Sequence, residues 1–163
     1  MQLNLKNLDA VSSNKIIASQ HKDPNAAIGL AAAYVAARPP FGTFRADRLM
    51  STIVGQIQRR HYAFAIQEGR VVGYGGWALC TRDVAEAWLA GGQVLASEVC
   101  RDGDVIIPVI IATSEPAALR CLTMHVRALY PGRPYMGRRI LPSGSRVCRG
   151  RLKGIAQSKL NTK

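Results

Sequence analysis

Acidic residues are missing from the C-terminal part of this 163-residue chain. Residues 116–163 hold eleven Lys and Arg but no Asp or Glu, whereas residues 1–115 hold the other eleven cations and all ten acids. The formal net charge of +12 therefore resides almost entirely in the last 48 residues. A segment without carboxylates cannot neutralise itself, so its field must be met by counter-ions or by an anionic partner.

Long apolar runs and closely spaced cysteines are also missing. No run approaches the roughly 18–20 residues that span a bilayer, and residues 105–112 give only eight, interrupted by Pro108. The first residues lack the continuous apolar stretch of a secretory signal, so we expect a cytoplasmic protein. Without a CxxC pair, a zinc site or a dithiol redox motif is not indicated, and we expect the thiols to be reduced and mostly buried. The cysteines are Cys80, Cys100, Cys121 and Cys148.

The remaining composition is that of a folded domain. Hydrophobic residues make up 48 % of the chain and charged residues 20 %, which excludes a disordered protein. A chain of this length forms one domain with a real core. We expect a flexible lead over residues 1–24, a domain over residues 25–155 whose C-terminal third is basic, and a basic tail over residues 156–163.

Helix signals dominate the first third. Asp23 and Pro24 supply an N-cap and a first-turn proline, which predicts a helix up to residue 37. The prolines at 39 and 40 must end it. Residues 45–60 place apolar side chains on one stripe and predict a second helix.

After residue 60, the spacing of the apolar residues changes from that of helices to that of strands. Residues 62–66 and 71–79 flank a turn at Gly69 and predict a β-hairpin. Thr81 predicts the cap of a short helix over 84–90. Residues 105–112 predict a buried strand, in which Pro108 indicates an edge, a bulge or a splay because it cannot donate to a ladder.

The C-terminal third begins with the signal for another helix. A hydroxyl cap at residues 113–114 and Pro116 predict a helix up to residue 129, and residues 135–141 and 145–148 predict two short strands. This order predicts an α+β domain with a mostly antiparallel sheet flanked by helices.

Several strings in this order carry a family resemblance. The most specific is VGYGGWAL at residues 72–79; residues 29–40, Tyr62-Ala63 and residues 103–113 add to it. Over about residues 26–150 the chain resembles the RTX toxin-activating (hemolysin-activating) lysine acyltransferases. The resemblance implies a GNAT-like fold and, in an active member, acyl transfer from acyl carrier protein to a lysine.

The same resemblance implies that the family's chemistry has been lost. The family's catalytic His falls at Phe41, which has no titratable nitrogen. Its catalytic Asp falls at Pro108 with a gap, or at Ile110 without one, and a nearby Ser falls at Arg38. We therefore expect a degenerate member with no catalytic residue at the family positions.

Three histidines remain as possible substitutes: His21, His61 and His125. His61 is the weak candidate for a relocated base, against a surface role beside Arg59 and Arg60. His125 is more simply a packing residue. The junction over residues 112–118 lacks the glycines of a pyrophosphate loop, so we expect no CoA site, no other cofactor and no metal.

The acid-free segment is the remaining functional signal. Arginine makes planar, paired contacts to phosphate that Lys cannot, and Tyr130 and Tyr135 offer stacking surfaces. The sequence favours nucleic acid, DNA first, over an acidic protein such as acyl carrier protein or a solvated basic face. The expected nucleic-acid-binding residues are Arg120, Arg127, Arg133, Arg138, Arg139, Arg146, Arg149, Arg151 and Lys153, and Lys159 and Lys163 lie beyond them.

Two hypotheses follow from these signals. The favoured one is a pseudoenzyme of the acyltransferase-like fold, reused for DNA binding or transcription regulation, for example in a mobile element. The alternative is an active protein-lysine acyltransferase that takes acyl groups from acyl carrier protein. A homodimer, or a scaffold role within a larger assembly, stays open.

Overall fold

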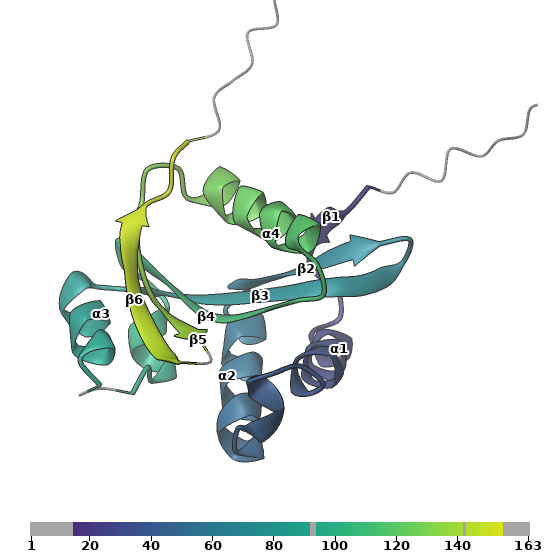
Figure 1. The fold of residues 1–163 in the computed structure, drawn as a ribbon, viewed down its shortest axis with the longest axis horizontal. Helices are drawn as coiled ribbons and strands as arrows, with labels where there is room; N and C mark the ends of the chain where they lie inside the picture. Colours follow the sequence, from purple (N-terminus) through teal and green to yellow (C-terminus); the bar gives the residue numbers. More distant parts are fainter. Residues whose placement is uncertain (1–14, 92–93, 142, 155–163) are drawn as a thin grey trace, which may run out of the picture.

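The computed structural model describes residues 15–91, 94–141 and 143–154. It contains one sheet with the order β1-β2-β3-β4-β5-β6 and helices on both of its faces (Figure 1). The strands are β1 (Ile17–Ser19), β2 (Tyr62–Gln67), β3 (Arg70–Cys80), β4 (Val105–Thr113), β5 (Pro134–Leu141) and β6 (Gly144–Arg151). The helices are α1 (Pro24–Ala36), η1 (Phe41–Thr43), α2 (Ala46–Gln58), α3 (Arg82–Leu89), η2 (Ser97–Cys100) and α4 (Pro116–Leu129).

All neighbouring strands are antiparallel except β4 and β5, which are parallel. The α+β prediction, with a mostly antiparallel sheet flanked by helices, is therefore confirmed. The predicted helices and strands are all present, and β6 extends three residues beyond the predicted strand. No helix among the described residues has the length and apolarity required to cross a membrane.

The alternation of the strands separates two apolar layers. On one face, Phe64, Tyr74 and Ile110 pack against α1 and α2, and Cys80, Ile107 and Met136 continue that face toward α3. On the other face, Ala65, Trp77 and Ile106 pack against α4 through Ala118 and Leu122. Figure 1 shows α4 alone above the sheet and α1 and α2 below it.

One strand was not expected from the sequence. Residues 17–19, placed in the flexible lead, form β1 and pair with β2 from Phe64 to Ile66. Gln20 strengthens this attachment, because its amide nitrogen donates to the carbonyl oxygens of Arg60 and Tyr62 at 2.9 and 2.7 Å. Residues 1–14 and the tail beyond residue 154 lie outside the described part.

The helix caps follow the sequence at two starts and depart from it at a third. Asp23 accepts from the Asn25 N–H at 2.9 Å, and Thr81 accepts from the Val84 N–H. The hydroxyl cap expected before α4 is wrong: Glu115 occupies the cap position without a side-chain hydrogen bond. The Ser114 hydroxyl donates instead to the Val72 carbonyl oxygen at 2.9 Å, which attaches the helix start to β3.

Candidate functional site

Pro108 sits where β4 is irregular. Gly76 faces Ile110 and Trp77 faces Pro108, so Val109 is an extra residue on β4. A bulge of this kind fits a residue that has no N–H for the ladder. Of the alternatives expected at Pro108, an edge, a bulge or a splay, the structure has the bulge.

Next to the bulge, the ladder between β4 and β5 is short. Only Ile106 and Tyr135 form a parallel bridge between them, although the two strands still touch at the bulge, where an added Cβ on Gly137 would be 3.0 Å from Pro108 Cγ. On the α4 side of the sheet lies an open cleft of about 440 Å³, lined by residues of β3, β4, α4, β5 and the segment after β6.

We call this space the β4–β5 cleft. Its walls are largely apolar, and Trp77 is fixed at its base by an Nε1–H bond to the Tyr130 hydroxyl at 3.3 Å. Gly75 forms part of the floor, where an added Cβ would make an ordinary contact with the Leu122 side chain at 3.5 Å. The lining residues are Gly75, Gly76, Trp77, Ile106, Pro108, Ile111, Leu119, Leu122, Thr123, Val126, Arg127, Tyr135, Arg151, Leu152 and Lys153.

Three of the expected polyanion-binding residues lie on the rim of this cleft. The Arg127 guanidinium donates to the carbonyl oxygens of Lys153 at 2.7 Å and Gly154 at 3.4 Å, which ties the segment after β6 to α4. Arg151 donates to the Gly132 carbonyl oxygen at 3.2 Å. Together with Lys153 they place three cations around an apolar space.

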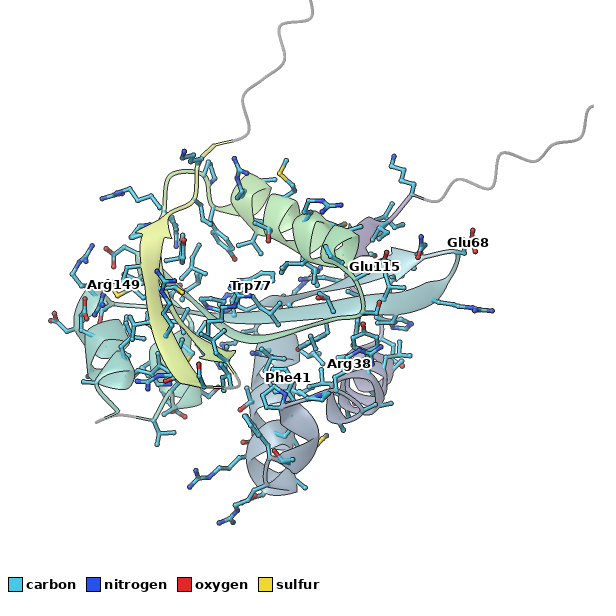
Figure 2. The ribbon with its side chains drawn as sticks, in the orientation of Figure 1. Arg38, Phe41, Glu68, Trp77, Glu115 and Arg149 are labelled. Carbon is cyan, nitrogen blue, oxygen red and sulfur yellow. The ribbon has the colours of Figure 1, made fainter. Side chains whose placement is uncertain are left out.

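Four of the other six expected nucleic-acid residues are divided between the two faces of the β5–β6 hairpin. Toward α3, Arg149 forms an ion pair with Glu86 at 2.6 Å and Arg138 donates to the Leu89 carbonyl oxygen. The hydrogen bond from Arg149 keeps the pKa of the Glu86 carboxyl below its ordinary value. Figure 2 shows Arg149 on this α3 side.

On the opposite face of the hairpin, Arg139 and Arg146 stand directly across from each other and are both exposed. Arg120 is exposed on α4, and Arg133 donates to the Gly103 carbonyl oxygen at 2.7 Å. The nine residues therefore form several groups rather than one patch.

The two tyrosines proposed for stacking on bases are half-buried and pack against the core layer on the α4 side of the sheet. Tyr130 accepts from Trp77 and lies under the Arg133 guanidinium, 5.2 Å from its ring centre. Tyr135 is half-buried in the β4–β5 cleft, and an added Cβ on Gly150 would lie 2.8 Å from its hydroxyl oxygen. Both rings serve packing in this structure.

The two positions at which the resemblance places a catalytic pair, Phe41 and Pro108, hold apolar side chains on different parts of the fold. Phe41 packs on the α1–α2 core layer and meets Phe44 edge-on, with ring centres 5.5 Å apart. Figure 2 shows Phe41 near Arg38, whose guanidinium stacks on Tyr34 at 3.4 Å. Pro108 lines the β4–β5 cleft and offers no proton acceptor there.

His61 is not the surface residue expected from its cationic neighbours. It is buried and stacks on Trp77, with ring centres 6.3 Å apart. Burial, followed by the field of Arg59, lowers the pKa of His61 below its ordinary value. Half-burial likewise lowers the pKa of His125, and the His21 ring accepts from the Asp23 N–H at 3.1 Å.

No cluster of three or more His, Cys, Asp or Glu in the described ranges has the arrangement of a metal site.

The fold and the site together define the class of protein. It is an α+β domain with a mostly antiparallel sheet, and an apolar cleft with three cations at its rim lies at the parallel pair β4 and β5. No protein-family model matches the chain. No curated protein matches it either.

A solved structure similar in fold is the GphF GNAT-like decarboxylase in complex with isobutyryl-CoA. The TM-score is 0.48 and the sequence identity 16 %, over 76 % of this chain and 65 % of that one. The chain thus spans less than two thirds of the length of that protein.

The β4–β5 cleft was not predicted from the sequence. Its walls come from β3, β4, α4, β5 and the segment after β6, which are far apart in the chain. Pro108 was the one local signal for it, because the strand irregularity that it indicates lies at the mouth of the cleft.

Proposed function

We propose that this protein binds an acyl group presented by an anionic carrier, as a catalytically degenerate relative of the toxin-activating acyltransferases. The observation that carries the proposal is the β4–β5 cleft, an apolar space of about 440 Å³ with Arg127, Arg151 and Lys153 at its rim. That volume falls in the usual range for small-ligand sites, which is roughly 300–1,000 Å³.

The apolar walls of the β4–β5 cleft suit the acyl chain of such a ligand, and the cations at its rim suit the anionic carrier. Each buried methylene of an acyl chain contributes about 0.8 kcal/mol, and Ile111 and Leu119 in the wall are 46 % and 41 % exposed, so they retain apolar area to lose. A phosphate-bearing arm or an acidic carrier surface would meet the cations at the rim.

The side chains that remain favour binding without the family's chemistry. A lysine acyltransferase needs a group that removes a proton from the attacking amine. Phe41 and Pro108 supply none, and the His61 ring is 9 % exposed. We therefore propose a pseudoenzyme, and acyl transfer through His61 is the alternative.

A pair of single substitutions tests the cleft. Ile111→Glu places a carboxylate inside the apolar wall, whereas Ile140→Glu makes the same change at an exposed strand position outside it. With a fluorescent long-chain fatty acid as the probe, we expect Ile111→Glu to weaken binding at least about tenfold, which corresponds to about 1.4 kcal/mol. Ile140→Glu should bind like the unmodified chain. Equal binding by both variants would contradict the cleft as the site.

A second candidate function, binding of nucleic acid as a DNA-associated or regulatory protein, is favoured by Arg139 and Arg146. Like charges directly opposite each other on antiparallel strands are destabilising, and an anion between these two exposed guanidinium groups would relieve the repulsion.

The charge-matched test uses two double variants. Arg139→Gln with Arg146→Gln should weaken binding of a DNA duplex and reduce the salt dependence by about two phosphate contacts. Arg48→Gln with Arg70→Gln removes the same charge elsewhere and should change binding less. If the two double variants lose affinity equally, the effect is one of net charge and this candidate is wrong.

A further inference from the structure

Two buried cysteines belong to the same core cluster near the end of β3, on the opposite face of the sheet from the β4–β5 cleft. Cys80 is the last residue of β3 and Cys100 the last of η2, and both belong to the α3-side core layer. Their side chains are 0 % and 2 % exposed. The turn after Cys100 packs directly on Cys80, since an added Cβ on Gly103 would lie 2.1 Å from the Cys80 carbonyl carbon and oxygen.

The two thiols interact as an unequal pair. The interaction between the two thiols lowers the pKa of Cys100 to about 7 and raises that of Cys80, so Cys100 is the thiol that loses its proton more readily. The nearby Arg59 guanidinium also favours the charged form. A thiolate held by a neighbouring thiol and a cation is the reactive form of cysteine.

Cys100 is the member of the pair that a small molecule can reach. It lines a second open cleft of about 480 Å³ between α2 and the 94–100 segment, which we call the α2 cleft. Arg59 lines the same cleft and donates from Nη1 to the Ser97 hydroxyl at 2.8 Å.

Polar donors without partners are buried beside this cleft. Gln56 lines it and is 1 % exposed; its Oε1 accepts from the Tyr74 hydroxyl at 2.9 Å. Within the described residues, Gln56 Nε2 and Arg59 Nε have no hydrogen-bond partner. Unsatisfied buried donors of this kind are rare and suit a small ligand that carries oxygen acceptors.

We propose that Cys80 and Cys100 form a dithiol–disulfide redox pair that is oxidised by a hydroperoxide entering through the α2 cleft. The Cys100 thiolate attacks the O–O bond of hydrogen peroxide, which breaks as an S–O bond forms, and the departing hydroxide takes a proton to become water. The Cys80 sulfur then attacks the Cys100 sulfenic acid, an S–S bond forms, and the S–O bond breaks to release a second water. Two thiols are oxidised by two electrons in total, and one peroxide is reduced.

The other cysteines provide internal references. Cys121 is half-buried, donates to the Ile16 carbonyl oxygen at 3.5 Å, and has a pKa raised by burial. Cys148 is also half-buried, on β6. If exposure governed oxidation, both would react before the buried pair; if thiolate character governs it, the pair reacts first.

Peptide mapping of the full chain tests the proposal. The chain is treated with a modest molar excess of hydrogen peroxide at pH 7, blocked with N-ethylmaleimide and cleaved with trypsin. Arg82 separates the two cysteines into peptides 71–82 and 83–101. We expect these peptides to appear linked, two hydrogens lighter than their sum, and to separate on treatment with dithiothreitol. Prior oxidation of Cys121 or Cys148, with the pair still reduced, would overturn the proposal.

Three variants separate the roles of the groups. With Cys80→Ser, Cys100 should stop at a sulfenic acid that dimedone traps. Arg59→Gln should slow oxidation at pH 7 about fivefold through a smaller thiolate fraction, whereas Arg60→Gln, at the same helix end but bonded to Gln20, should leave the rate unchanged.

Unfolding provides the last control. The link between peptides 71–82 and 83–101 should form faster in the folded chain than in urea, because the fold brings the two thiols together. A link that forms only in urea, or equal slowing by Arg59→Gln and Arg60→Gln, would contradict the proposed site.

Discussion

Gly76 leaves the space that the buried Gln56 amide occupies when it accepts a hydrogen bond from Tyr74. A Cβ at this position would lie 2.1 Å from Gln56 Oε1, the atom that accepts from the Tyr74 hydroxyl. We expect Gly76→Ala to displace the Gln56 amide and to lower the free energy of unfolding by about 3 kcal/mol, from overpacking and a lost buried hydrogen bond.

The neighbouring glycine is the matched control for that measurement. Gly75 lies on the same strand, but its added Cβ would meet Leu122 at an ordinary 3.5 Å. Urea denaturation should therefore show a near-native midpoint for Gly75→Ala and a clearly lower one for Gly76→Ala. Similar midpoints for the two variants would contradict the packing described for Gln56.

His61 predicts a dependence of stability on pH. Its pKa is lowered in the fold by burial first and by Arg59 second, so the unfolded chain binds the proton more readily. The stability held by the neutral ring is complete above the unfolded pKa of about 6.5 and is lost as the pH falls through the lower folded value.

The variant His61→Gln should reduce this acid sensitivity. Thermal unfolding measured between pH 7 and pH 5 is expected to give a smaller decrease in Tm for His61→Gln than for the unmodified chain. His125 contributes in the same direction, so His125→Gln provides the comparison. An unchanged slope in His61→Gln would argue against the buried neutral ring.

At the scale of elements, the start of α1 depends on a side chain and the start of α4 does not. Asp23 accepts from the Asn25 N–H at 2.9 Å, and Glu115 makes no capping bond. Asp23→Ala should cost about 1 kcal/mol, whereas Glu115→Ala should cost a few tenths through the helix dipole alone. Chemical denaturation distinguishes the two, and a larger loss for Glu115→Ala would contradict the observed caps.

The helices and long strands could be predicted because their signals are local. Asp23-Pro24, Gly69 and Thr81 each act within one turn of chain, and the structure places the expected cap or turn at each of them. The three-residue β1 has no such signal, since Ile17–Ser19 becomes a strand only by pairing with β2. The α4 cap was missed because Ser114 forms its bond with a residue 42 positions away.

The site was predictable only in part, for the same reason. For Pro108 the sequence offered an edge, a bulge or a splay, and the structure has the bulge. The cations were visible in the composition. Their distribution over α4 and both faces of the β5–β6 hairpin depends on strand register, which sets Arg138 and Arg139 on opposite faces. The approach of Cys80 to Cys100 likewise depends on how η2 returns to β3.

For the whole molecule, the excess positive charge and the apolar cleft are connected, because the acid-free segment lines the cleft. The acid-free segment contributes nine of the fifteen residues that line the β4–β5 cleft, including the three cations at its rim, and the near-neutral remainder contributes the other six. An apolar space surrounded by cations favours a ligand with an apolar chain and an anionic carrier over either part alone. Affinity should therefore depend on the acyl chain as well as on salt.

Calorimetric titration of the full chain with acyl carrier protein tests this account most directly. The same carrier is used with and without a long-chain acyl group, so only the contribution of the chain differs. The account predicts at least about tenfold tighter binding of the acylated carrier, and predicts that Ile111→Glu removes this advantage while Ile140→Glu retains it. Equal affinity for the two carriers, or no binding of either at low salt, would contradict it.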